Sequence, residues 1–237
     1  MYGTLYLIPT PLGATPLSDI LPEATRQTAA RLEHFVVEHA KTARAFLKQV
    51  GSQHALQSLD LRELSEHTTT DALEPLLAPL LAGHDVGLLS EAGCPAIADP
   101  GADLVRLAHQ RGIRVRPLVG PSAILLALMG SGLVGQRFTF HGYLPAKPEA
   151  RALSLKDLEK RSLRDRAAQV FIETPYRNRA MFDAIVHSCA DDTWLTLACD
   201  LTTGQETIGT MPVSAWRQES PVLEKRPCVF ALWRAAS

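Results

Sequence analysis

The stretch VGLLSEAGCPAIADPG, residues 86–101, does most to decide the fold. Its first four residues are continuously apolar, as in a buried strand, and a helical pattern follows at Ala102–Arg111. The twelve residues between them, Ser90–Gly101, form a long loop for a strand-to-helix connection. Its side chains are small except for Glu91 and Ile97, so its backbone can approach a flat ligand closely. Ligands of α/β proteins bind beyond the carboxyl ends of strands, so we predict a binding site here.

On both sides of this loop, short apolar runs alternate with helical patterns. Strands are predicted at Leu5–Pro9, Phe35–Val37, Leu59–Leu64, Val86–Leu89 and Val115–Leu118. Helices are predicted at Leu17–Ala30, capped by Ser18 or Asp19, at Lys41–Val50, at Asp71–Ala82 and at Ala102–Arg111. Pro75 and Pro79 make the third of these helices irregular. The alternation predicts a mostly parallel sheet covered by helices.

After Gly120 the pattern changes, because strands follow one another more often without a long helix between them. Strands are predicted at Phe138–Tyr143, Gln169–Ile172, Trp194–Cys199, Glu206–Gly209 and Cys228–Trp233. Helices are predicted at Ser122–Met129, Ser154–Ser162 and Arg177–Ser188. We therefore expect two α/β domains, residues 1–118 with a mostly parallel sheet and residues 119–237 with a mixed one.

Composition and charge narrow the function. The chain has 237 residues and a net charge of −1, so the whole molecule is not a basic surface for nucleic acid. The start, MYGTLYLIPTPLG, lacks the pattern of a signal peptide, and the longest apolar stretch, Ala123–Met129, is too short to span a bilayer. The cysteines form no C-x-x-C pair, which indicates no zinc site or other metal and no disulfide framework, and favours the reducing cytoplasm.

Charge is unevenly distributed along the chain. Residues 137–179 hold ten Lys and Arg against five acidic residues, a net charge of +5, which leaves −6 for the remainder. Two interpretations stay open: a solvated helix face, or a basic patch for an anionic substrate.

Three further loops follow predicted strands. Residues 9–13, PTPLG, form a rigid bend, and no G-x-G-x-x-G fingerprint supports a dinucleotide site there. Residues 119–123, VGPSA, place Ser122 as an N-cap and offer free N–H groups at a helix N-terminus. In residues 171–177, FIETPYR, Arg177 opposes the helix dipole, which suggests an anionic partner. Cys94 could be a nucleophile, but a small packing cysteine is the commoner case.

These loops together resemble the tetrapyrrole methylase superfamily, and most closely its branch that methylates the ribose 2′-hydroxyl of a cytidine in bacterial small-subunit ribosomal RNA. The matching segments cover most of the chain in the family's order. They are LYLIPTPLG (5–13), EHAKTARAFLKQVG (38–51), LSEHTTTD (64–71), LLSEAGCPAIADPGADLVRLA (88–108), PLVGPSAILLALMGSGL (117–133), RFTFHGYLPAKPEAR (137–151), FIETPYR (171–177) and CDLTTGQETIGT (199–210).

The resemblance implies a cytoplasmic, homodimeric methyltransferase of two α/β domains, with S-adenosylmethionine in the cleft between them. By motif, the cofactor-binding residues would be Pro9, Gly93, Cys94, Ile97, Ala98, Ser122, Ala123, Ile172, Leu201 and Cys228. The sulfonium is already an activated methyl donor, so the chain must chiefly orient the acceptor.

A ribose hydroxyl would also gain from a general base. The carboxylates Glu38 and Glu173 are the first candidates on matching motifs, ahead of Glu66 and His67. Ribosomal RNA would be the partner, and its phosphates would meet Lys147, Arg151 and Arg177.

Three polar motifs depart from the branch. Glu38-His39-Ala40-Lys41 replaces Glu-Asp-Thr-Arg, Glu66-His67-Thr68 replaces Glu-His-Asn, and Cys199-Asp200-Leu201-Thr202 replaces Arg-Glu-Leu-Thr. The branch's small C-terminal extension is also expected to be missing. Because the cofactor loops are kept better than these motifs, two alternatives stay open: a methylase of a small molecule of the corrin or siroheme type, and a non-catalytic module that binds S-adenosylmethionine.

Overall fold

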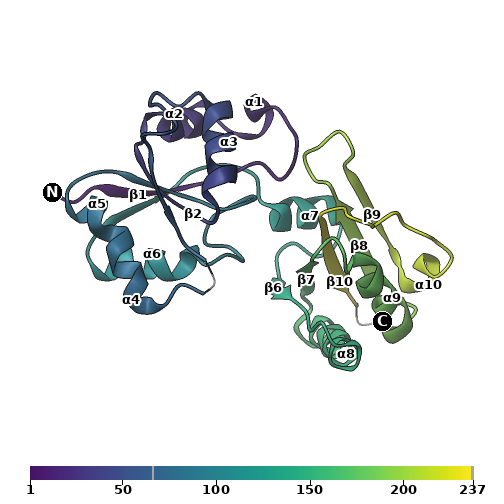
Figure 1. Ribbon diagram of the computed structural model, residues 1–237. Helices are drawn as coiled ribbons and strands as arrows, with labels where there is room; N and C mark the ends of the chain where they lie inside the picture. The colour runs from purple at the N-terminus through teal and green to yellow at the C-terminus, as the bar shows by residue number, and fades with distance from the viewer. Residues whose placement is uncertain (66, 236–237) are drawn as a thin grey trace. The chain divides into compact units, whose positions relative to one another are not determined.

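The computed structural model describes residues 1–65 and 67–235, which form two compact units, Met1–Ser122 and Ala123–Ser237 (Figure 1). The boundary that the sequence suggests, between residues 118 and 119, lies shortly before this division. Among the described helices, none is long and apolar enough to cross a membrane.

The first unit contains a five-stranded sheet in which each strand pairs in parallel with its neighbours. Its strands are β1 (Thr4–Ile8), β2 (His34–Val37), β3 (Asp60–Glu63), β4 (Val86–Leu89) and β5 (Arg114–Pro117), in the order β3-β2-β4-β1-β5. All four residues of β4 are buried, as the continuous apolar run predicts for a strand covered on both faces. The predicted parallel sheet is confirmed.

Helices connect these strands. They are α1 (Leu17–Ile20), α2 (Glu23–Arg31), α3 (Ala40–Val50), α4 (Thr70–Leu73), the 3-10 helix η1 (Glu74–Leu77), α5 (Ala78–Leu81) and α6 (Gly101–Gln110). The segment containing Pro75 and Pro79 is divided into three short helices, which confirms the predicted irregularity.

The prediction of one helix over Leu17–Ala30 is wrong. Pro22 has φ −53° and ψ 150°, outside the helical region, and it separates α1 from α2. The predicted caps are wrong too, because Pro16 occupies the N-cap position of α1 and the Ser18 hydroxyl instead donates to the Asp19 carboxylate. Pro22, which cannot donate a backbone N–H, ends one helix and starts the next.

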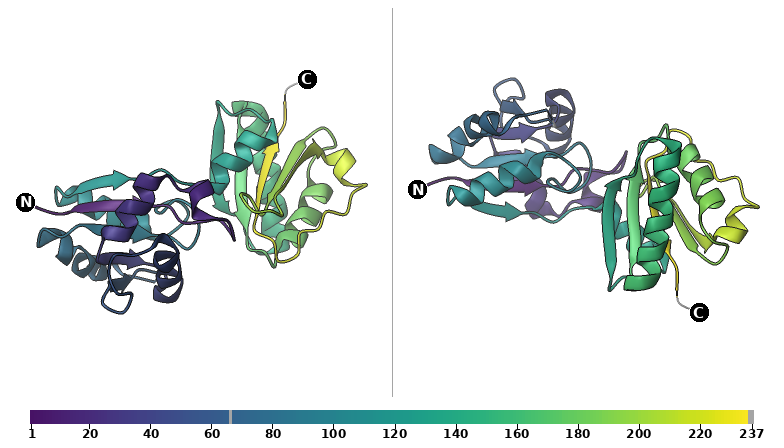
Figure 2. Two further views of the ribbon diagram at one scale, coloured as in Figure 1. Left: turned by 90° about the horizontal axis from the view of Figure 1, so that it is seen from above. Right: turned by 90° about the horizontal axis from the view of Figure 1, so that it is seen from below.

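Two apolar clusters form the core of the first unit, and they contain alternate residues of the same strands. Tyr6 and Ile8 of β1 belong to the cluster that includes Phe46 and Leu47 of α3, whereas Leu5 belongs to the other cluster. Successive strand residues point to opposite faces, so the two clusters occupy the two faces of the sheet. Helices accordingly lie on both sides of it (Figure 2).

The second unit contains a mixed five-stranded sheet, as predicted. Its strands are β6 (Phe138–Tyr143), β7 (Ala168–Glu173), β8 (Trp194–Cys199), β9 (Thr207–Pro212) and β10 (Cys228–Trp233), in the order β6-β7-β10-β8-β9. Only the β6–β7 pair is parallel among the described strand pairs of this sheet.

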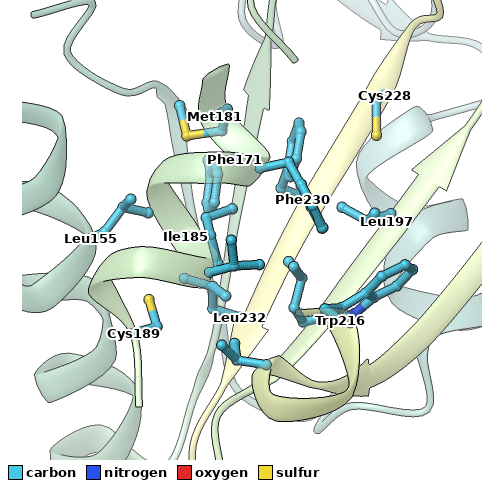
Figure 3. Close-up of a cluster of buried hydrophobic side chains, with 14 of the residues drawn as sticks. Leu155, Phe171, Met181, Ile185, Cys189, Leu197, Trp216, Cys228, Phe230 and Leu232 are labelled. Carbon is cyan, nitrogen blue, oxygen red and sulfur yellow. Dashed lines mark hydrogen bonds between the residues drawn. The ribbon is translucent and has the colours of Figure 1, made fainter. Parts of the chain in front are cut away.

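Its helices are α7 (Ala123–Ser131), α8 (Pro148–Asp165), α9 (Asn178–Ser188) and α10 (Val213–Trp216). Helix α8 is longer than the predicted Ser154–Ser162, because it begins at Pro148 and ends where Arg166 adopts a left-handed φ of 50°. Phe171 of β7 and Phe230 of β10 stack in the core with ring centroids 5.5 Å apart (Figure 3).

Candidate active site

The loops after β1 and β4 are joined at the carboxyl edge of the first unit's sheet. The Thr10 N–H donates to the Gly93 carbonyl at 2.9 Å, and the Gly93 N–H donates back to the Thr10 carbonyl at 3.1 Å. The buried Thr10 hydroxyl also donates to the Ser90 carbonyl at 3.1 Å. These bonds hold residues 9–13 against the start of the loop at residues 90–101.

The segment after β5 meets the same two loops. The Cys94 thiol donates to the Pro121 carbonyl at 3.4 Å, and the Val119 carbonyl accepts from the Thr25 hydroxyl at 2.9 Å. Gly120 packs so closely on Pro9 that a Cβ added to it would lie 2.4 Å from the Pro9 Cβ. The three loops therefore form one cluster, although residues 9, 94 and 121 are far apart in the sequence.

The loop at residues 90–101 is held in an unusual backbone conformation. Gly93, Ala96 and Ala98 have φ values of 78°, 66° and 62°, in the left-handed region that alanine rarely adopts. The Asp99 carboxylate compensates by accepting the N–H groups of Ala96 and Gly101, both at 2.8 Å. Burial raises the pKa of Asp99. Such local strain, paid for by fixed hydrogen bonds, is found most often at binding sites.

A pocket of about 560 Å³ lies beside this cluster, within the first unit. It is lined by residues 10, 11 and 13–16 after β1, by α3 and by the ends of β2 and β4. Glu38, directly after β2, lines it and accepts the Glu91 N–H at 2.9 Å. Burial, and next the negative charges of Asp99 and Glu91, raise the pKa of Glu38. A raised pKa makes this carboxylate a stronger proton acceptor.

Sequence reasoning missed two polar residues of this pocket, Thr42 and Glu91. The Thr42 hydroxyl donates to Glu91 Oε1 at 2.5 Å, and His39 Nδ1 lies 3.3 Å from the same oxygen. Glu91 was visible as one of the few large side chains of its loop. Its position next to α3 was not visible, since it depends on β2 and β4 being neighbours in the sheet.

Glu173 and Arg177 form an ion pair in the second unit. Both Arg177 Nε, at 2.9 Å, and Nη2, at 2.6 Å, contact Glu173 Oε1, which also accepts the Thr174 N–H at 2.7 Å. The Glu173 side chain is 0% exposed, and its Oε2 has no hydrogen-bond partner among the described residues. The anionic partner that Arg177 suggested is therefore present within the same turn.

The remaining predicted cofactor residues of the second unit gather at one end of its sheet. Cys228 pairs in register with Glu173 of β7 and with Cys199 of β8. Ile172 precedes Glu173, and the buried Leu201 follows Cys199 closely.

The other predicted residues are more scattered. Ser122 ends the first unit and Ala123 begins α7. Lys147 is exposed before α8, but Arg151 within α8 is only 7% exposed, and its Nε has no partner among the described residues. His67 is exposed, and Glu66 lies outside the described residues.

Cys94 has the environment of a packing thiol. Its thiol donates a hydrogen bond to the Pro121 carbonyl, and burial raises the pKa of Cys94, so the reactive thiolate is disfavoured.

Comparison with known proteins identifies the family. No family model matches the chain. However, the chain is 35% identical over 220 residues to ribosomal RNA small subunit methyltransferase I of Escherichia coli O157:H7, covering 92% of this chain and 73% of that protein. The chain belongs to this methyltransferase family. The protein of the same name from Pseudomonas aeruginosa is 31% identical over 238 residues, covering 98% of this chain and 80% of that protein.

Solved structures agree on the fold. The methyltransferase CobJ has a TM-score of 0.64 at 18% identity, covering 98% of this chain and 94% of that one. Uroporphyrin-III-C-methyltransferase from Thermus thermophilus has a TM-score of 0.58 at 16% identity, with the same coverage. The predicted tetrapyrrole-methylase fold and the prediction of a methyltransferase are both confirmed.

Proposed function

We propose that this chain transfers the methyl group of S-adenosylmethionine to a ribose 2′-hydroxyl of small-subunit ribosomal RNA. One observation carries the proposal: three loops joined at a sheet edge lie beside a pocket lined by Glu38, whose pKa is raised. The names of the relatives, all small-subunit ribosomal RNA methyltransferases, support the RNA acceptor.

The residues of the loop cluster fit this cofactor. Ile97 is 52% exposed and Val119 is 71% exposed, so both loops joined by the Cys94–Pro121 contact offer apolar surface to an adenosyl group. Backbone groups and small side chains supply the rest of the surface, and they suit a flat ligand. Proposed contacts are Pro9, Gly93, Cys94, Ile97, Ala98, Ser122 and Ala123, and from the second unit Ile172, Leu201 and Cys228.

When bound, the sulfonium supplies the activated methyl group. The chain's own residues must hold the acceptor hydroxyl in line and remove its proton. We assign proton removal to Glu38, because it lines the pocket and is only partly buried, whereas Glu173 is fully enclosed and held by Arg177. Glu91, fixed by Thr42, supports Glu38 through its backbone N–H. Glu173 then acts in this proposal by holding the turn around Arg177.

The proposed function also includes contacts with RNA phosphates, a homodimer and a location in the cytoplasm. Of the proposed phosphate contacts Lys147, Arg151 and Arg177, the exposed Lys147 is the best placed, because Arg151 is buried and Arg177 is paired with Glu173. A homodimer in the cytoplasm completes it, since two copies would double the basic segment presented to one RNA.

The test is methyl transfer from radiolabelled S-adenosylmethionine to small ribosomal subunits purified from cells lacking this protein, with protein and small-molecule fractions of the same cells in parallel. We expect label in RNA, recovered after nuclease digestion as a 2′-O-methyl nucleoside, and its loss in Glu38→Gln. Glu33→Gln, an exposed glutamate of the same unit, is the matched control.

Other outcomes would overturn the proposal. Label confined to a tetrapyrrole fraction would favour a small-molecule methylase. Cofactor binding without transfer to any fraction would favour a non-catalytic module.

A further inference from the structure

Two tyrosines of the second unit are placed in solvent at the ends of neighbouring parallel strands. Tyr143 is the last residue of β6 and is 56% exposed, and Tyr176, in the turn after β7, is 84% exposed. Tyr143 pairs in register with Ile172 of β7. Because β6 and β7 run parallel and lie side by side, both tyrosines belong to the same end of the sheet (Figure 1).

The exposure of Tyr176 does not serve the core. Phe171, in the strand leading to the same turn, is 0% exposed and stacks on Phe230, so it already supplies the aromatic packing there. A tyrosine that is 84% exposed removes little of its ring from water and gains little stability from burial. Its ring face is instead available to a ligand.

The turn that carries Tyr176 is rigidly held. Buried Glu173 binds the Thr174 N–H and the Arg177 guanidinium, and the Arg177 N–H donates to the Thr174 carbonyl at 2.9 Å. The buried Asn178 amide then donates to the Arg226 carbonyl at 2.6 Å, which anchors the start of α9. A ring on a fixed turn loses little conformational freedom when a ligand binds.

Two cationic side chains lie close to the tyrosines in the sequence. Lys147 is exposed shortly after Tyr143, and the Arg177 side chain is 37% exposed beside Tyr176. Arg177 is ion-paired with the buried Glu173, so the exposed Lys147 is the cation that this surface offers to a phosphate. Exposed aromatic faces among cationic side chains are the features with which proteins bind unpaired nucleotides, whereas paired RNA offers no free base faces.

We propose that Tyr143 and Tyr176 form a stacking platform for unpaired bases of the RNA substrate, with Lys147 contacting a neighbouring phosphate. This inference rests on the proposed function, because it takes RNA as the acceptor, and it adds that the recognised RNA region is single-stranded.

The test measures binding of the full chain to two fluorescent RNAs of equal length, an unstructured strand and a complete duplex, by anisotropy. We expect Tyr176→Ala and Tyr143→Ala each to weaken binding of the single strand by about 10-fold or more, and to change duplex binding little. Tyr176→Phe should bind like wild type, because stacking needs the ring and not the hydroxyl. Tyr2→Ala, which removes a 52% exposed tyrosine of the first unit, is the matched control.

The outcomes separate this inference from the proposed function. If the wild type binds neither RNA and does not methylate small ribosomal subunits, the RNA acceptor itself fails, whereas methylation of the subunits without binding of the single strand overturns the platform alone. If it binds the single strand and both alanine variants, with unchanged melting temperatures, bind equally well, only the platform is overturned. Competition by polyglutamate as strong as that by polyuridine would assign the surface to an acidic polypeptide and would also overturn the platform.

Discussion

Gly120 offers a sharp test of the loop cluster, through the substitution Gly120→Ala. The new Cβ would lie 2.4 Å from Pro9 Cβ, 2.8 Å from Pro9 Cγ and 2.9 Å from Leu21 Cδ2. Carbon atoms that are not bonded settle at about 3.5–4 Å, so the segment at residues 119–121 must move by about 1 Å. Pro9 cannot rotate away, because its ring is closed on the backbone.

This displacement sets the expected loss of stability in Gly120→Ala. Overpacking of this kind costs about 1–3 kcal/mol of the free energy of unfolding. The shift also moves the Pro121 carbonyl, which accepts the Cys94 thiol and ties this segment to the loop at residues 90–101. Since misplacement by about 1 Å lowers rates by as much as about 100-fold, methyl transfer should fall by more than the loss of stability explains.

Calorimetric titration with S-adenosylmethionine measures the effect on cofactor binding, thermal unfolding measures the effect on stability, and transfer of radiolabelled methyl groups measures the effect on the rate. We expect Gly120→Ala to bind the cofactor at least about 10-fold more weakly, the equivalent of about 1.4 kcal/mol. Gly135→Ala is the control, because a Cβ there meets nothing within 4 Å and the backbone is not left-handed. Reduced stability with wild-type affinity would remove this segment from the cofactor site, and unchanged stability would refute the close contact itself.

Three further predictions concern charged groups of the two units. Glu38→Gln should lower kcat by about 100-fold or more and abolish the acid limb of the rate profile, which in the wild type should lie above the ordinary pKa of 4.5 because burial raises the pKa of Glu38. Since the pKa of Glu38 is higher in the folded state than in the unfolded state, its ionisation destabilises the fold as pH rises between the two pKa values. Urea unfolding at pH 7 should therefore show Glu38→Gln no less stable than wild type, and a clear loss of stability would contradict the raised pKa. Asp99→Ala removes the acceptor of the Ala96 and Gly101 N–H groups and should lower the free energy of unfolding by about 2–4 kcal/mol. Limited proteolysis should then cleave the loop faster, whereas unchanged cleavage would show that the loop holds its shape without the carboxylate. Arg177→Ala leaves the Glu173 charge buried without its cation and should lower the free energy of chemical unfolding by about 2–4 kcal/mol. Adding Glu173→Gln should restore part of this stability, whereas additive losses in the double variant would contradict an interaction between the two side chains.

Local sequence accounted for much of the fold. The apolar run at residues 86–89 indicated a strand buried on both faces, and the small residues at 90–101 indicated a ligand loop beyond it. Prolines were a weaker guide. Pro75 and Pro79 were correctly taken to disturb a helix, whereas the break at Pro22 was missed, because proline also starts helices readily and the apolar pattern continued past it.

The site could be predicted only in part. Glu38 was a candidate through its motif, and it lines the pocket. The proximity of Glu91 and Thr42 was not predicted, since the parallel order β2-β4-β1 brings together loops that the chain keeps far apart. The sequence indicated that Arg177 opposes the helix dipole and needs an anionic partner. That partner is Glu173, which the sequence had suggested as a general base instead. The sequence shows which residues are charged but not the distances between their side chains, and those distances decide whether two opposite charges form an ion pair.

The order of apolar runs and small residues along the chain was by itself enough to indicate the parallel sheet, the mixed sheet and the long loop at residues 90–101, because these depend on spacing between neighbours in the sequence. The methyltransferase family was indicated by the resemblance of whole motifs. Tertiary structure alone decided which loops meet, that Gly120 must remain a glycine against Pro9, and that Glu173 is enclosed while Tyr176 stays in solvent. Burial and contact depend on the packing of segments from distant parts of the chain, and no local pattern encodes them.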